Sequence, residues 1–122
     1  MPRLLLVDDD AFLLQMIGGK FAAGGFEVLY AHDGEEGLAM LAKLKPDIVV
    51  SDYRMPNMDG LGFGARAKAN PETAGIPIVF LTSEDFSPEV QASLKALGIA
   101  DYMHKSLDFP EILARVKKAL GL

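Results

Sequence analysis

Residues 48–52 have the sequence Ile-Val-Val-Ser-Asp, a short apolar run that ends on a carboxylate. Three other runs have the same form: residues 4–7 before Asp8 and Asp9, residues 78–81 before Thr82, and residues 102–104 before Lys105. Apolar runs of this length, separated by amphipathic helical stretches, are typical of parallel strands buried on both faces of a sheet. In an open parallel sheet the ligand site lies just beyond the carboxyl ends of the strands. The pattern therefore brings three carboxylates, a hydroxyl and an ammonium together, which indicates a metal-assisted phosphoryl site.

The composition fits one globular domain. The chain has 122 residues, and no linker, repeat or low-complexity segment interrupts it, so we expect a single domain over residues 1–122. Apolar residues make up 50% and charged residues 24%, the mix of a soluble globular protein. The net charge of −5 argues against direct nucleic-acid binding, which needs a basic face. The absence of cysteine excludes disulfides and thiolate metal sites.

The chain also lacks the usual signals for membranes and export. No apolar stretch approaches the roughly 20 residues that span a bilayer, and no signal-peptide pattern opens the sequence. We therefore expect a cytoplasmic protein with no membrane contact.

Strands and helices are expected in alternation. The expected strands are Arg3–Val7, Glu27–Ala31, Ile48–Ser51, Ile78–Leu81 and Asp101–His104. Helix starts are marked by Asp10 as an N-cap, by Asp33 with Glu36 in a capping-box pattern, near Leu61, and by Ser87 before Pro88. The apolar helix faces are expected to carry Leu13, Ile17 and Phe21; Leu38, Leu41 and Ala42; Phe63 and Ala67; Val90, Leu94 and Leu97; and Ile112 and Val116.

A strand followed by a helix, repeated five times, predicts an α/β fold with a doubly wound parallel sheet. The three fully apolar runs belong at its centre, and the mixed segments Glu27–Ala31 and Asp101–His104 suit its edges. Right-handed crossovers leave few topologies, and the known strand order of flavodoxin-like folds, 2-1-3-4-5, puts these two segments at the edges, so we match the chain to that order. The switch point of that order lies between the first and third strands, where Asp8, Asp9 and Asp52 converge.

Four segments together resemble a known family. They are Asp8-Asp9 after the first strand, residues 46–60 (PDIVVSDYRMPNMDG), residues 76–83 (IPIVFLTS) and residues 100–106 (ADYMHKS). In this order and spacing they resemble the receiver domain of response regulators in two-component signalling, whose minimal members are the chemotaxis regulators. The resemblance covers essentially the whole chain and implies a CheY-like (βα)5 fold with a five-stranded parallel sheet. Any one of the motifs is common by itself, so the combination carries the inference.

The resemblance implies that Asp52 is the phosphoacceptor. Its carboxylate would attack a phosphohistidine on a sensor histidine kinase or phosphotransfer protein and form an aspartyl phosphate. The resemblance also implies a Mg²⁺ ion held by Asp8, Asp9, Asp52 and the backbone carbonyl of Arg54. The residues alone lead to the same ion, because clustered carboxylates repel one another and all-oxygen ligands suit a hard cation. Lys105 would neutralise a further phosphoryl oxygen.

Thr82 and Tyr102 would convert this chemistry into a signal, again by resemblance. The Thr82 hydroxyl would move to the phosphoryl group and Tyr102 would turn into the vacated space, as a shift between two pre-existing states. The surface of the fourth helix, fifth strand and fifth helix would then control binding of a downstream target or of the protein's own output domain, and dimerisation on phosphorylation is possible. The protein would be no enzyme in the ordinary sense and would catalyse only its own phosphorylation and dephosphorylation.

Two further features concern the rate and the geometry of this site. Arg54 and Glu84 stand two positions after Asp52 and Thr82, and our hypothesis is that their charges meet across the site mouth and slow hydrolysis. The family usually has Lys-Pro with a cis peptide bond where this chain has Lys105-Ser106. A cis bond before serine would cost about 2.5–4 kcal/mol, so we expect a trans bond.

Other functions compete with this interpretation. A phosphohydrolase with a nucleophilic aspartate would need a second acid where Arg54 stands. A flavin carrier would need a phosphate-binding loop where Asp8-Asp9-Asp10 would repel the ligand. A non-phosphorylated pseudo-receiver that acts as a protein-interaction adaptor is opposed by the complete set of site residues. His32 and His104 are too few and too isolated for a zinc site, so we expect both to be incidental.

Overall fold

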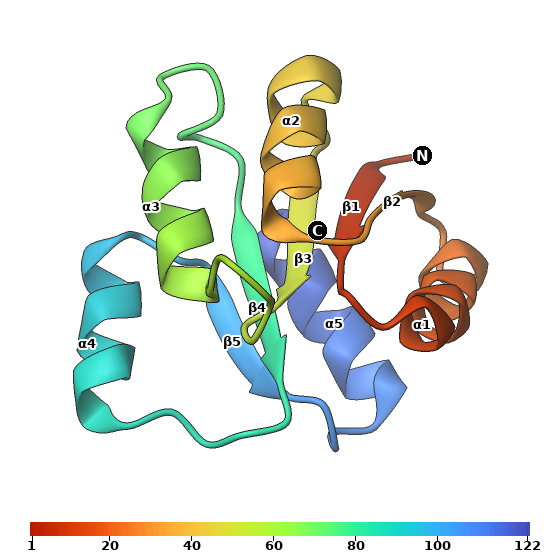
Figure 1. Cartoon of the computed structure of the whole chain (residues 1–122). Coiled ribbons are helices and arrows are strands. Elements are labelled where there is room, and N and C mark those ends of the chain that lie inside the picture. Colours follow the sequence, from red (N-terminus) through yellow and green to blue (C-terminus); the bar gives the residue numbers. More distant parts are fainter.

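The computed structural model describes residues 1–122 and alternates strands with helices along the chain (Figure 1). The strands are β1 (Arg3–Val7), β2 (Glu27–Ala31), β3 (Ile48–Asp52), β4 (Ile78–Thr82) and β5 (Asp101–His104). The helices are α1 (Ala11–Ala23), α2 (Gly34–Leu44), α3 (Gly60–Ala69), α4 (Pro88–Ala96) and α5 (Phe109–Ala119). None of these helices combines the length and the apolar character that a bilayer crossing requires.

The strands form one parallel sheet in the order β2-β1-β3-β4-β5, which confirms the predicted doubly wound, CheY-like α/β fold. Strands β3 and β4 are each one residue longer than expected. The extra residues are Asp52, which pairs with Leu81, and Thr82, which pairs with His104. Both side chains are therefore carried by the rigid end of the sheet rather than by the loops that follow it.

The core lies on both faces of the sheet. Every residue of β3 and β4 is buried, as expected for strands covered by helices on both sides. Alternate residues of β1 point to opposite faces: Leu5 and Val7 join the cluster under α2, α3 and α4, while Leu4 and Leu6 join the cluster under α1 and α5. Burial of each large apolar side chain contributes about 1.5–3 kcal/mol, so the two helix layers of Figure 1 hold the sheet firmly.

Side-chain caps determine where four of the helices begin. Asp10, Asp33, Asp59 and Ser87 each accept a hydrogen bond from a backbone N–H in the first turn of the following helix. Each cap of this kind contributes about 1 kcal/mol. The caps expected at Asp10, Asp33 and Ser87 are confirmed, and Asp59 starts α3 at Gly60. Each of these helices is the next element after a strand, so the caps also hold the loops at the carboxyl end of the sheet.

For two residues, Leu13 and Ala42, the prediction that they face inward is wrong. The fully buried leucine of α1 is Leu14 rather than Leu13, and Ala42 of α2 is exposed. Helix α2 instead turns glycines toward the sheet: a methyl group on Gly37 would lie 3.1 Å from the Val7 side chain. The missing side chain lets the helix approach closely, and a search for apolar periodicity gives glycine no weight as an inward residue.

Candidate functional site

Three carboxylates gather where β1 and β3 end. Asp8 follows β1 directly, Asp9 is the next residue, and Asp52 is the last residue of β3. One carboxylate oxygen from each lies within 4.8 Å of the other two. Asp8 and Asp52 are 6% and 9% exposed, whereas Asp9 is exposed to solvent. The structure thus brings together the three acids that the sequence placed at the switch point.

Lys105 reaches into this cluster from the loop after β5. Its Nζ lies 3.2 Å from Asp8 Oδ2 and 3.4 Å from Asp52 Oδ2, and all three side chains are largely shielded from solvent. The backbone N–H of Lys105 donates to the carbonyl of Thr82 at 2.7 Å, which anchors the start of the loop to β4. The peptide bond from Lys105 to Ser106 is trans, as expected. The trans bond does not prevent the ammonium from reaching the acids.

The electrostatic environment of Asp52 combines opposing influences. Burial is the largest of them and raises the pKa of Asp52 above that of an ordinary aspartate. The Lys105 ammonium acts in the opposite direction, and the Asp8 carboxylate again raises the pKa. The net shift is upward, so the single ammonium does not fully compensate for burial and like charge. A buried acid in this state is stabilised by a further positive charge nearby.

Thr82 lies beside the cluster at the end of β4 and is 2% exposed. Its Oγ1 accepts a hydrogen bond from the backbone N–H of Glu84 at 3.1 Å, and the Thr82 hydroxyl has no hydrogen-bond acceptor of its own. The hydroxyl hydrogen is therefore available for a new acceptor. Across the mouth of the site, Arg54 Nη2 lies 3.1 Å from Glu84 Oε2, so the expected contact between these charges is confirmed. Both side chains are more than half exposed.

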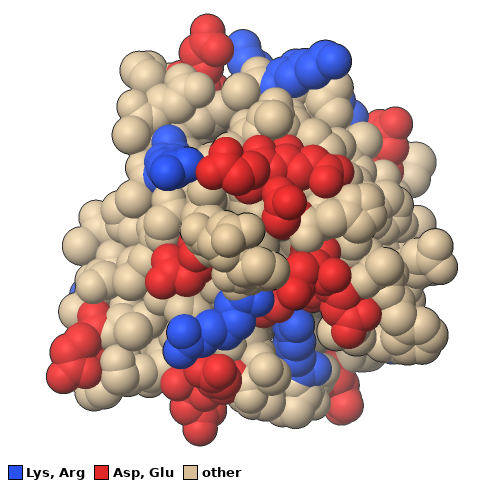
Figure 2. All heavy atoms as spheres, in the orientation of Figure 1, with Lys and Arg blue, Asp and Glu red and all other residues tan.

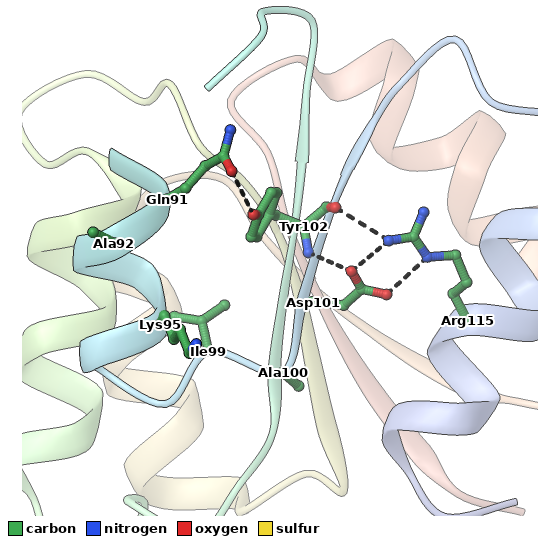
Figure 3. A pocket seen from close by; sticks show the side chains of 8 residues that line it. All are labelled: Gln91, Ala92, Lys95, Ile99, Ala100, Asp101, Tyr102 and Arg115. Carbon is green, nitrogen blue, oxygen red and sulfur yellow. Dashed lines mark hydrogen bonds and ion pairs between the residues drawn. The ribbon is translucent and has the colours of Figure 1, made fainter. Parts of the chain in front are cut away.

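Tyr102 points toward Gln91 of α4 (Figure 3). Its hydroxyl donates a hydrogen bond to Gln91 Oε1 at 3.2 Å, and its ring meets the ring of Phe86 edge to face with centroids 5.1 Å apart. A groove of about 480 Å³ lies between α4 and β5 at this point. On its far side Arg115 of α5 donates to both carboxylate oxygens of Asp101, at 2.8 and 2.5 Å. Polar contacts thus link α4, β5 and α5.

Acidic side chains are prominent on the face shown in Figure 2, where they gather in patches with Lys and Arg side chains beside them. This distribution agrees with the net charge of −5. The positive charges are scattered over this face in small groups, so it has no continuous basic surface.

Sequence reasoning missed several residues that surround the site. Gln91 and Phe86 contact Tyr102, and no motif marked either of them. His104, which was expected to be incidental, makes two hydrogen bonds to loops of the site. One sequence signal was available for His104. It stands two positions before Ser106, where this chain departs from the usual Lys-Pro and has a backbone N–H that a nearby side chain can bind. Side-chain partners of this kind emerge only when the loops are placed in space.

A family model of the response regulator receiver domain matches residues 4–117, a stretch that contains every residue of this site. The chain belongs to the response regulator receiver family. It is 33% identical over 122 residues to the DNA-binding dual master transcriptional regulator RpaA of Synechocystis. This match covers 98% of the present chain and 49% of RpaA. It is 36% identical over 118 residues to response regulator MprA of Mycobacterium avium. This match covers 97% of the present chain and 50% of MprA.

A solved structure of a chemotaxis response regulator has the same fold as this chain. Chemotaxis response regulator CheY4 of Vibrio cholerae matches with a TM-score of 0.85 and 33% identity over 98% of each chain. The present receiver domain spans about half the length of the two curated relatives. Receiver domains bind Mg²⁺ at an acidic pocket, and the carboxylates of Asp8, Asp9 and Asp52 form an acidic cluster at the corresponding end of this sheet.

Proposed function

We propose that this receiver domain takes a phosphoryl group onto Asp52 from the phosphohistidine of a sensor histidine kinase or phosphotransfer protein. A carboxylate oxygen attacks the phosphorus and forms the O–P bond, while the P–N bond breaks and the imidazole nitrogen keeps the electron pair. The observation that carries this proposal is the place of Asp52. It ends β3, is 9% exposed, and lies 3.4 Å from the Lys105 ammonium beside two further carboxylates.

The donor set at the site fits Mg²⁺. Oxygen ligands are those that Mg²⁺ prefers, and three carboxylate oxygens lie close enough together to share one ion. Asp8, Asp9, Asp52 and the backbone carbonyl of Arg54 are the groups that would hold it. When bound, the ion neutralises the cluster and polarises the phosphoryl oxygens. The raised pKa of Asp52 is consistent with this assignment, because burial and the Asp8 carboxylate disfavour the negative charge of Asp52 and a cation would favour it.

The neighbouring residues then have separate roles. Lys105 would contact a phosphoryl oxygen, since its ammonium already bridges Asp8 and Asp52. Thr82 would donate its free hydroxyl hydrogen to the phosphoryl group, and its loop would move inward with it. Tyr102 would leave the glutamine of α4 and turn toward the vacated space. That turn changes the polar contacts among α4, β5 and α5, and with them the binding surface.

The partners follow from this switch. We infer that residues 1–122 act as a single cytoplasmic receiver domain that catalyses only its own phosphorylation and dephosphorylation. Its phosphorylated surface would bind a downstream target, an output domain of the same protein, or a second copy. A relative of twice this length is named as a DNA-binding transcriptional regulator, which supports the output domain. The non-phosphorylated adaptor lacks support, because Asp8, Asp9, Asp52 and Lys105 are all present and lie together.

Incubation with acetyl phosphate and Mg²⁺, followed by intact-mass measurement, tests the proposal. We expect the mass of one added phosphoryl group on the parent and none on Asp52→Asn. The Asp85→Asn variant is the matched control, since Asp85 is an exposed acid in the loop after β4, and it should react like the parent. Reaction of Asp52→Asn at the parental rate, or no reaction of the parent, would overturn the proposal.

A further inference from the structure

His104 connects two loops of the site by side-chain hydrogen bonds. It is the last residue of β5 and pairs with Thr82 across the sheet. Its Nδ1 lies 3.0 Å from the backbone N–H of Ser106, and its Nε2 lies 3.1 Å from the carbonyl oxygen of Ser83. A backbone N–H only donates and a carbonyl only accepts, so both bonds require a neutral ring with its hydrogen on Nε2.

The two bonded residues directly follow the residues that act at the site. Ser83 comes after Thr82, and Ser106 comes after Lys105. The last backbone hydrogen bond between the two segments is from Lys105 N–H to the Thr82 carbonyl at 2.7 Å. The His104 ring continues this pairing one residue further by means of a side chain. It thereby links the loop behind the ammonium to the loop behind the hydroxyl.

The bond to Ser106 depends on a feature particular to this chain. A proline at position 106 would have no backbone N–H to donate. Because serine stands there, the N–H exists, and the His104 ring is placed to accept it. The carbonyl of His104 also accepts from Leu107 N–H at 3.2 Å, which closes the turn around Lys105 and Ser106.

We propose that His104 is a positioning residue for phosphoryl transfer, which rests on the proposed function of Asp52. The hydrogen bond from Ser106 N–H to its Nδ1 fixes the turn after Lys105 and so keeps the Lys105 ammonium 3.4 Å from the Asp52 carboxylate. In a chain with proline at position 106, the proline ring would restrict this turn instead. Its Nε2–H bond to Ser83 restrains the loop of Thr82 in the unphosphorylated arrangement. His104 itself touches neither the acids nor the phosphoryl position, so it acts through its two neighbours.

Variants of His104 separate the two bonds. His104→Val removes both. Because the bond to Ser106 is the one that positions Lys105, the rate of phosphorylation by acetyl phosphate should fall about three- to tenfold, the range for loss of that one hydrogen bond. His104→Asn keeps an acceptor at the δ1 position and should restore most of the rate. His104→Gln keeps a donor near the ε2 position but no acceptor for Ser106, and should remain slow. His32→Val is the matched control, because His32 lies at the same end of the sheet and bonds only Glu36.

A double-mutant cycle tests whether Ser106 is the partner. In a Ser106→Pro background the N–H is gone, so His104→Val should change the rate less than about twofold. An equal loss in both backgrounds, or rescue by glutamine and not by asparagine, would overturn the inference. The free energy of unfolding of each variant, measured in urea, shows whether the rate change exceeds a general loss of folded protein.

A measurement that needs no phosphorylation separates this inference from the proposed function. Hydrogen exchange of the Ser106 amide should be slow in the parent and in His104→Asn, and fast in His104→Val. Unprotected Ser106 in a parent that still phosphorylates would overturn the role of His104 alone. A protected Ser106 in a parent that never phosphorylates would overturn the role of Asp52 instead.

Discussion

At the scale of single residues, Asp52 is held in a place that disfavours its own charge. It ends a strand that is buried at every position, and a second carboxylate lies beside it. Lys105 offsets part of this cost through contacts of 3.2 and 3.4 Å to the two buried acids. A cation beside the cluster would relieve this cost, because a positive charge partners the buried carboxylates.

The raised pKa of Asp52 has a consequence for stability. The folded protein holds this proton more tightly than the unfolded chain, so the associated stability is complete below the ordinary pKa of aspartate and is lost as the pH rises through the raised pKa. At about pH 8 in EDTA, Asp52→Asn should therefore increase the free energy of unfolding by roughly 1 kcal/mol. Urea titrations measure this difference. It should shrink toward about pH 3, where both states of the parent are protonated; a difference that grows on acidification would contradict the assignment.

The Arg54–Glu84 ion pair should affect the lifetime of the phosphoryl group rather than stability. Both side chains are exposed, so the pair contributes little to folding, about 1 kcal/mol or less. Because the pair crosses the mouth of the site, Arg54→Ala should admit water and speed dephosphorylation about two- to tenfold, a change equivalent to one weak interaction. Loss of radiolabelled phosphate over time measures the rate.

A control for that prediction lies elsewhere on the surface. Arg66 and Glu35 form an equally exposed ion pair at 3.0 Å between α3 and α2. Arg66→Ala should leave the dephosphorylation rate unchanged. If Arg54→Ala and Arg54→Ala/Glu84→Ala both kept the parental rate, the ion pair would have no part in hydrolysis.

At the scale of secondary-structure elements, glycines decide how closely helices approach their neighbours. Gly37 of α2 faces the sheet, where a methyl group would lie 3.1 Å from fully buried side chains of Val7 and Phe63. Gly19 of α1 faces open space, with nothing within 4 Å of an added methyl group. The same residue type therefore serves close packing in one helix and merely weakens the other.

This contrast gives a matched pair of substitutions. Gly19→Ala should stabilise the protein by about 0.5–1 kcal/mol, because alanine favours the helix and meets no neighbour. Gly37→Ala gains the same helix preference but compresses the core, where overpacking costs about 1–3 kcal/mol, so its net effect should be destabilising. Thermal unfolding measures both variants. Stabilisation by Gly37→Ala would show that α2 can move away from the sheet at little cost.

At the scale of the whole molecule, the fold places its functional groups at one end of a rigid sheet. The acids follow or end β1 and β3, the hydroxyl ends β4, and the ammonium follows β5. A ligand that binds all of these groups therefore bridges four strands. Its binding free energy adds to the free energy of unfolding, because the unfolded chain has no such cluster.

Magnesium should therefore stabilise the folded protein as a whole. At a Mg²⁺ concentration about 100 times its Kd, the free energy of unfolding should rise by about 2.7 kcal/mol. Asp9→Asn removes an exposed member of the cluster, so it should fold normally and lose most of this gain. Urea unfolding with and without Mg²⁺ measures the effect. An equal gain in the parent and in Asp9→Asn would place the cation elsewhere.

Much of the architecture was predictable because the burial of a strand determines which of its residues are apolar. Strands covered on both faces are continuous apolar runs and edge strands are mixed, so central and edge strands could be told apart. Matching them to the known order of flavodoxin-like folds then brought Asp8, Asp9 and Asp52 together. The N-caps at Asp33 and Ser87 were also predictable, since capping depends on residues only a few positions apart. The chemical roles of the site residues stay predictions until phosphorylation is measured.

The contacts that tune the site depended on the arrangement of the chain in space. Periodicity records whether a position is buried, but not which polar group stands opposite a given side chain. The two bonds of His104, and the inward turn of Gly37, arise from loops and helices that meet at distances of a few ångströms. Hydrogen bonds and van der Waals packing require atoms to lie within a few ångströms of each other, so they depend on how the loops and helices are placed. Amino-acid patterning thus specified the layers and the residues at the end of the sheet, whereas the folded geometry selected the contacts of each side chain.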